Sequence, residues 1–207
     1  MKAYSGMNGK IRLIACGVFR SALEYLNLEQ RHSTLHVTFL PSNLHLHPQE
    51  LRNILSKTIN GTHKSNKRTV CLYGNCFPDF HNFCVQHGVD KVAGHHCFQM
   101  LLGGKRYEDT MKEMVGTYFL ERNLILHFEQ YCLEPLALRK DEIRRALFKP
   151  YRRVIYIRQP SDPDLVPQAG ELARFLRLPL EIRDADYSYL KQTLVNLIEV
   201  CSQESFG

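Results

Sequence analysis

Cysteine and histidine residues follow three of the strands that the sequence predicts. Cys16 ends one apolar run, Cys76 follows another, and His95-His96-Cys97 follows a third. Thiolates and imidazoles are the ligands of protein-bound zinc, and thiolates also hold iron–sulfur clusters. We therefore predict a metal site, occupied by zinc or an iron–sulfur cluster, whose ligands are Cys16, Cys76, Cys97 and His95.

Two other interpretations of these cysteines stay open. A thiolate is also a nucleophile, so the same residues suit a metal-free thiol enzyme. Cysteine is also among the most buried residue types, and Cys71, Cys84 and Cys201 lie inside predicted strands or helices, as is typical of core packing. The sequence contains no compact C-x-x-C pair. A metal site therefore depends on a fold that brings distant loops together.

Two further residues are candidates for roles beside the metal. His45 lies in a proline-bounded loop after the predicted strand at residues 35–40, and it is the candidate proton carrier. Tyr118 lies at the start of a later predicted strand and is the candidate lining residue of a cofactor pocket. In an enzyme, the metal would act as a Lewis acid on a thiol or methyl-bearing substrate.

Strand and helix patterns alternate along the chain, which favours an α/β fold with a mostly parallel sheet and helices on both faces, doubly wound and Rossmann-like. In such sheets the ligand crevice lies outside the carboxyl ends of the strands, which is where the candidate residues fall. Short apolar runs predict strands at residues 11–15, 35–40, 69–73, 91–93, 117–120, 154–157 and 180–182. Helices are predicted at residues 19–29, from 48 onward, and at 78–87, 98–102, 107–114, 124–148 with an interruption at Pro135, 165–176 and 187–201.

Length and composition bound the organisation of the chain. We expect a flexible N-terminus at residues 1–10 and one α/β domain at 11–207, with two lobes divided near residues 121–150 as the alternative. No apolar run approaches the ~20 residues of a membrane span, and seven cysteines without a secretory signal indicate thiols in the cytoplasm. The basic run at residues 139–153 is interrupted by Asp141 and Glu142, which is typical of a solvated helix face, so no nucleic-acid partner is expected.

Five short segments occur in a fixed order: Ile14-Ala15-Cys16-Gly17, Leu44-His45 followed by Pro48, Tyr73-Gly74-Asn75-Cys76, His95-His96-Cys97 leading into Leu101-Leu102-Gly103, and Gly116-Thr117-Tyr118-Phe119. Together they resemble the uncharacterised family called domain of unknown function 1638. The resemblance spans about residues 11–131, and residues 186–190 look similar too. The chain departs from the family pattern at His96, where Asp is usual, and at Phe77, where Gly is usual.

The resemblance implies a cytosolic prokaryotic or archaeal protein from organisms that carry out corrinoid-dependent methyl transfer. By that analogy we expect metal binding linked to methyl or one-carbon metabolism, with a small molecule or a corrinoid protein as partner. The alternative is a non-catalytic accessory protein that handles a metal or cofactor for a partner methyltransferase. The lack of a recognisable acid–base dyad or cofactor loop in the sequence favours that alternative.

Overall fold

The computed structural model describes residues 10–61 and 67–203. Residues 1–9 of the predicted flexible N-terminus lie outside the described residues, and Lys10 already belongs to the first strand. The chain forms two compact units, the first made of residues 1–96 and 191–207 and the second of residues 97–190. Among the described residues, no helix combines the length and apolar character needed to cross a bilayer.

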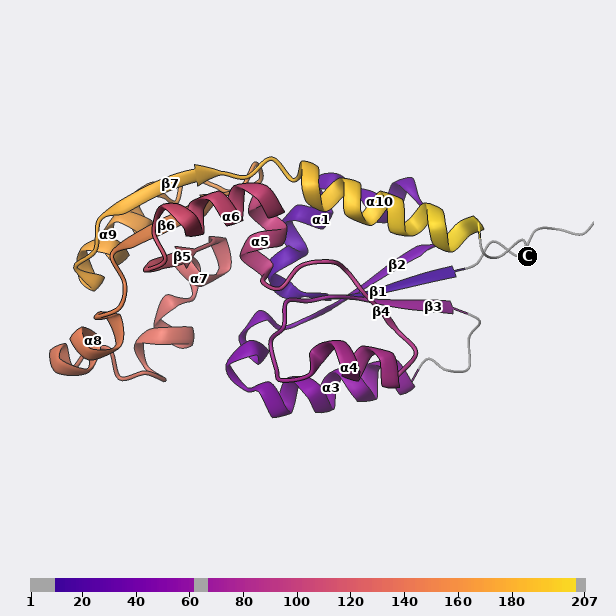
Figure 1. Ribbon diagram of the computed structural model, residues 1–207, viewed down its shortest axis with the longest axis horizontal. Coiled ribbons are helices and arrows are strands. Elements are labelled where there is room, and N and C mark those ends of the chain that lie inside the picture. Colours follow the sequence, from indigo (N-terminus) through magenta and orange to yellow (C-terminus); the bar gives the residue numbers. More distant parts are fainter. Residues whose placement is uncertain (1–9, 62–66, 204–207) are drawn as a thin grey trace, which may run out of the picture. The chain divides into compact units, whose positions relative to one another are not determined.

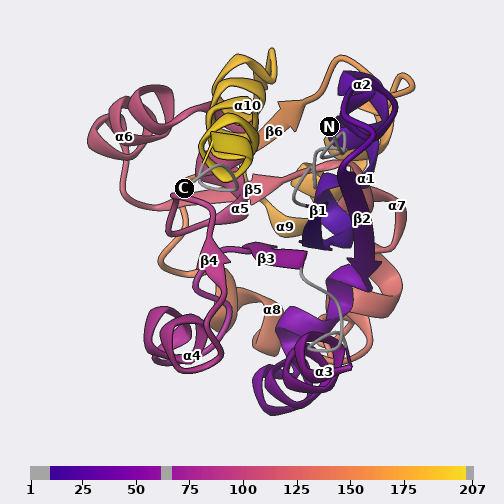
Figure 2. The same cartoon turned by 90° about the vertical axis from the view of Figure 1, so that its right-hand side faces the viewer.

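The first unit is built on a four-stranded parallel sheet with the order β2-β1-β3-β4. Figures 1 and 2 show α3 and α4 on one face of this sheet, and α1 with α10 on the other. The sheet is therefore doubly wound, as predicted. Its strands are β1 (Lys10–Cys16), β2 (Leu35–Leu40), β3 (Lys67–Leu72) and β4 (Asp90–Lys91). Its helices are η1 (Gly17–Phe19), α1 (Arg20–Leu26), α2 (Leu28–Arg31), η2 (Ser42–Leu46), α3 (Pro48–Asn60), α4 (Phe80–Gln86) and most of α10 (Ser188–Gln203).

The sequence of the first sheet explains its burial. Helices cover both faces of β1 and β3, so the carboxyl halves of these central strands, residues 13–16 and 70–72, are continuous apolar runs rather than alternating ones. Ile14, Ala15, Cys71 and Leu72 have no exposed surface. Proline at position 48 begins α3, because a residue without an N–H is tolerated in the first turn of a helix.

The second unit has a three-stranded parallel sheet with the order β5-β6-β7. Along β5 the side chains alternate: Leu120 joins the core formed with α7, α8 and α9, whereas Phe119 stacks on Phe98 of α5 and Tyr107 of α6. Both faces of this sheet are thus covered as well. Its strands are β5 (Thr117–Leu120), β6 (Arg153–Arg158) and β7 (Leu180–Asp184). Its helices are α5 (Cys97–Leu102), α6 (Gly104–Glu113), α7 (Arg122–Leu126), the π-helical turn η3 (Glu129–Leu133), α8 (Asp141–Phe148) and α9 (Val166–Leu176).

The observed division of the chain differs from the predicted single domain and from the alternative boundary near residues 121–150. The first boundary falls between His96 and Cys97, and the chain returns to the first unit at Lys191. The physical reason is strand pairing. β5 pairs with β6 and not with β4, so a second sheet begins there and requires its own apolar cover.

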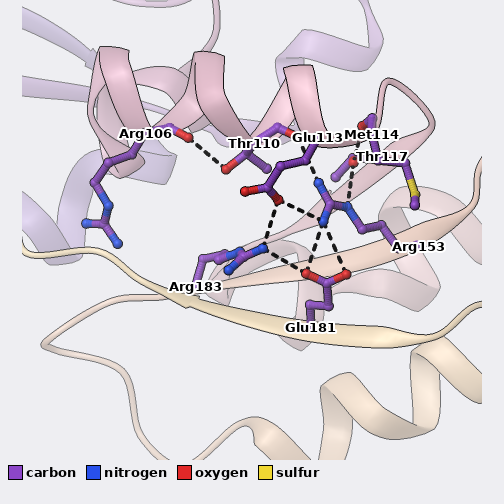
Figure 3. A network of polar contacts seen from close by, with 8 residues as sticks. All are labelled: Arg106, Thr110, Glu113, Met114, Thr117, Arg153, Glu181 and Arg183. Carbon is purple, nitrogen blue, oxygen red and sulfur yellow. Dashed lines mark hydrogen bonds and ion pairs between the residues drawn. The ribbon is translucent and has the colours of Figure 1, made fainter.

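A buried arginine closes the amino-terminal edge of the second sheet (Figure 3). Arg153, the first residue of β6, is 4% exposed and donates to Thr117 Oγ1 at 3.0 Å and to the Thr110 carbonyl at 2.8 Å. Its Nη1 also donates to the carboxylates of Glu113 and Glu181, at 3.2 and 3.1 Å. The basic run at residues 139–153 was predicted to be a solvated helix face, whereas its last residue, Arg153, links α6 to all three strands.

Candidate functional site

The strand order of the first sheet reverses between β1 and β3. From β1 the chain moves outward to β2, then crosses back to β3 on the other side of β1. In open α/β sheets, ligands bind in the crevice at such a switch point, outside the carboxyl ends of the strands. β1 ends at Cys16, and the segment from Tyr73 to Cys76 leaves β3. Two of the predicted ligands therefore follow the two strands that flank this crevice.

Tyr73 directly follows β3 and lies beside the end of β1 at Cys16, because Ala15 pairs with Leu72 in the register of the two strands. The side chain is 1% exposed, and its hydroxyl is buried without a hydrogen-bond partner. Burial raises the pKa of Tyr73 well above its ordinary value, and the charges that Cys16, Cys71 and Cys76 carry as thiolates raise it further. A buried hydroxyl without a partner is costly, so this position is suited to a ligand atom.

Cys76 is the more accessible of the two thiols. It is half-buried and borders a surface hollow of about 540 Å³ formed by the segment from Asn75 to His81. Burial raises the pKa of Cys76, while the Lys91 ammonium group and a backbone hydrogen bond with Gly74 act in the opposite direction. The thiol therefore stays protonated near neutral pH unless a further cation stabilises the thiolate.

Backbone and side-chain contacts tie the loop after β4 to the same edge. The Asn75 N–H donates to the His95 carbonyl at 2.8 Å, and the Asn75 side-chain nitrogen lies 3.2 Å from His95 Nδ1. Lys91 Nζ donates to the Gly94 carbonyl at 2.5 Å, just before the histidine pair. Partial burial lowers the pKa of His96, and the charges of His95 and Lys91 lower it further. These effects favour the neutral form of His96, which is the form that binds metals.

His45 lies at the end of the neighbouring strand β2. It is an exposed residue of η2, and its Nδ1 lies 2.5 Å from the Ser42 carbonyl oxygen. The loop after β1 runs close to this turn: a Cβ on Gly17 would lie 3.1 Å from the Leu40 carbonyl oxygen and 3.2 Å from the Ser42 nitrogen. His45 therefore shares the carboxyl edge with Cys16, and its proton-carrier role remains a prediction.

The other two predicted site residues belong to the second unit. Cys97 is the first residue of α5 and lies near Tyr107, whose pKa it raises in addition to the larger effect of burial. Tyr118 packs edge-on against Phe148, and its hydroxyl lies 3.7 Å from the sulfur of Cys132. Tyr118, the predicted pocket residue, thus packs against the hydrophobic core of the second unit.

Six described cysteines form no disulfide bond: Cys16, Cys71, Cys76, Cys84, Cys97 and Cys132. Within residues 10–61 and 67–203, no three side chains of His, Cys, Asp or Glu are grouped as the ligands of one metal ion. The first unit thus presents two thiols and one buried hydroxyl at the ends of neighbouring strands, and a histidine pair on the adjoining loop.

Sequence reasoning missed Tyr73 and Lys91. Lys91 was assigned only to a strand, and Tyr73 only to a strand and to one of the family segments, without a role in the site. A usable signal existed for Tyr73, which is a polar-tipped side chain at the carboxyl end of the apolar run at residues 70–72, where the crevice of a parallel sheet is expected.

Comparison with known proteins supports the resemblance drawn from the five segments. A family model described as "Protein of unknown function (DUF1638)" matches residues 39–194, which is more than half of the chain. The matched range includes Cys76, His95 and Cys97, and Cys16 precedes it. No curated protein and no solved structure matches the chain.

Proposed function

We propose that this chain, which belongs to the DUF1638 family of proteins of unknown function, binds a metal ion at the carboxyl edge of its first sheet. Cys16 and Cys76 are the anchoring donors. The observation that supports this proposal is that Cys16 and the segment from Tyr73 to Cys76 follow the two strands that flank the switch point of the sheet, where the buried hydroxyl of Tyr73 has no hydrogen-bond partner.

The chemistry of the donors defines the class of metal. Thiolates select zinc, cuprous copper and iron–sulfur clusters over magnesium or calcium. A bound cation would favour the thiolate form of Cys76 and so offset the burial that raises its pKa. The Tyr73 hydroxyl would then donate to a thiolate sulfur, and contacts of this kind orient the ligands of a metal.

Further donors follow β4, which is the neighbour of β3 in the sheet. His95 and His96 supply imidazoles from the loop after β4, and Cys97, the next residue, is the predicted third sulfur. Zinc or an iron–sulfur cluster is the proposed occupant. In a catalytic version of this proposal, the metal acts as a Lewis acid on a thiol or methyl-bearing substrate and His45 carries the proton.

The experiment combines metal analysis with thiolate spectroscopy. The full chain is purified without oxygen, its zinc and iron are quantified, and the metal-free form is titrated with Cd²⁺ while cadmium–thiolate charge-transfer absorption is followed. Cys16→Ser and Cys76→Ser are expected to lose most of this absorption, since each removes a donor sulfur. Cys132→Ser is the matched control, because it removes a buried thiol from the second unit.

The outcomes separate the proposal from its rivals. Stoichiometric metal that both variants lose and the control keeps supports a site at Cys16 and Cys76. Loss in all three variants, or in none, overturns it. Rapid alkylation of Cys76 by iodoacetamide without any metal binding would replace the proposal with metal-free thiol chemistry.

A further inference from the structure

The carboxyl edge of the second sheet carries its own group of buried polar side chains. Glu121 follows β5 and Gln159 follows β6, and they are 5% and 3% exposed. Asp162 lies three residues beyond Gln159 and accepts its backbone N–H at 2.9 Å. By the same rule that placed the first crevice, this is the ligand-binding edge of a parallel sheet.

Two polar atoms of this group have no partner. Asp162 Oδ2 accepts the Tyr156 hydroxyl at 2.7 Å, but Asp162 Oδ1 is buried and unpaired. Gln159 Oε1 accepts the Tyr187 hydroxyl at 3.0 Å, but Gln159 Nε2 is likewise buried and unpaired. One unpaired atom is therefore an acceptor and the other a donor. A metal ion satisfies only acceptors, whereas a molecule with both an N–H group and an oxygen satisfies both.

The charge around these atoms favours a cation as the donating group. Glu121 accepts backbone N–H groups from Asn123 and Leu124, both at 2.8 Å, and so caps α7. Burial raises the pKa of Glu121 to about 7; the nearby charge of Asp162 contributes in the same direction, and the charge of Arg122 opposes it. Asp162 itself lines the hollow, and its carboxylate charge makes an ammonium group a stronger partner for the unpaired Oδ1 than a neutral N–H group.

A surface hollow of about 640 Å³ leads to this group. Gln159, Asp162, Asp164 and Asp184 contribute to its lining, and Arg158 is the basic residue among them. Arg158 is held by Asp184 through two contacts, at 2.6 and 3.0 Å. The hollow is therefore net acidic, although the chain as a whole carries a formal charge of +6.

From this arrangement we infer that the hollow beside Gln159 and Asp162 binds a small molecule that carries an ammonium group together with a hydroxyl or carbonyl oxygen. The ammonium group donates to Asp162 Oδ1, and the oxygen accepts from Gln159 Nε2. The site lies wholly within the second unit and does not depend on the metal proposed for the first.

The probe is ethanolamine, added to the full-length protein while its backbone amide signals are followed by NMR. Ethylene glycol, which has the hydroxyl groups but no charge, is the neutral counterpart. Asp162→Asn keeps the shape of the side chain, removes its charge and replaces one of its two carboxylate oxygens with a donor nitrogen, so the variant is expected to bind ethanolamine roughly 10-fold more weakly or worse. Asp164→Asn is the matched control, because it makes the same charge change on an exposed residue of the same hollow.

Saturable shifts around the hollow with ethanolamine but not with ethylene glycol, weakened by Asp162→Asn and retained in Asp164→Asn, support the site. Equal weakening in both variants indicates diffuse charge and overturns the inference. Absence of saturable shifts with ethanolamine overturns it too, and so does a response to Mg²⁺ in place of ethanolamine. Should Asp162→Asn fail to fold, the contrast between the two probes on the unaltered chain still decides the question.

Discussion

Replacing Arg153 with Met tests how the second unit is held together. Methionine preserves most of the apolar stem, so the change removes chiefly the guanidinium group and its hydrogen bonds. Water cannot replace the lost hydrogen bonds, because the Arg153 side chain is only 4% exposed. Arg183→Met is the matched control: Arg183 contacts the same two carboxylates, Glu113 and Glu181, at 3.0 Å, but its side chain is 37% exposed.

The expected cost follows from what each partner loses. In Arg153→Met, the Thr110 carbonyl and the Thr117 hydroxyl each lose a buried bond to a charged donor, of the kind that contributes roughly 1.5–3 kcal/mol. Glu113 and Glu181 lose less, because their side chains are 52% and 39% exposed and both keep Arg183. We expect Arg153→Met to lower the free energy of unfolding by about 3 kcal/mol, and Arg183→Met by less than ~1 kcal/mol.

Urea denaturation followed by circular dichroism measures both changes. A loss of about 3 kcal/mol moves the midpoint by roughly 1–2 M urea for a typical dependence of stability on denaturant. The reasoning fails if the two variants unfold at the same urea concentration, since Arg153 would then act as an ordinary surface charge. It also fails if Arg153→Met is as stable as the unaltered chain.

Three further outcomes are expected from urea denaturation. The pKa of Glu121 is about 7 in the folded chain, whereas the ordinary pKa of this group is 4.5, so the folded state binds the proton more tightly than the unfolded state does. The free energy of unfolding should therefore fall by about 3 kcal/mol as pH rises from 4.5 to about 7, and Glu121→Gln should flatten this dependence. Gly116→Ala should destabilise by ~1–3 kcal/mol, because its Cβ would lie 2.6 Å from a backbone carbonyl oxygen, whereas Gly170→Ala, which meets no atom within 4 Å inside α9, should stabilise by ~0.5–1 kcal/mol. Tyr73→Phe removes an unpartnered buried hydroxyl and should raise the stability of the metal-free protein by about 1 kcal/mol while weakening Cd²⁺ binding.

The strands could be predicted from the sequence because the central strands of a doubly wound sheet are buried on both faces. Each predicted apolar run corresponds to an observed strand, from β1 to β7. The helical pattern at residues 124–148 was predicted with an interruption at Pro135, and turns at residues 134–139 do separate the π-helical turn from α8; the further break between α7 and that turn was not predicted. The two-sheet division was not predictable in this way. Strand pairing is a long-range choice, and the local pattern of β5 does not reveal whether its neighbour is β4 or β6.

The sequence could predict only that the residues of the candidate site lie at the ends of strands. The position of Cys16 and Cys76 after the strands that flank the switch point follows from parallel topology, which alternation of strands and helices does indicate. Arg153 shows the opposite case. Its neighbours in sequence are basic and exposed, and its burial arises from Glu113 and Glu181, which lie far away along the chain. The pattern of charges along the sequence does not reveal partners that are so distant in the chain.

The contrast between the edges of the two sheets supports functional interpretation of their carboxyl ends. The amino edge of the second sheet gives nearly every buried donor of Arg153 a partner. The carboxyl ends leave the Tyr73 hydroxyl, Gln159 Nε2 and Asp162 Oδ1 unpaired. The Nε atoms of Arg144 and Arg183 are also unpaired, but each belongs to a guanidinium group that makes other hydrogen bonds.

Each unpaired buried group costs roughly 1–3 kcal/mol, which is a large share of the ~5–15 kcal/mol that stabilises a typical domain. Replacing Tyr73 by Phe would remove such a cost at little loss of packing. The chain keeps these unpaired groups at the strand ends where parallel sheets bind ligands, whereas its buried arginine at the opposite edge is paired. This contrast is best explained if bound ligands supply the missing partners.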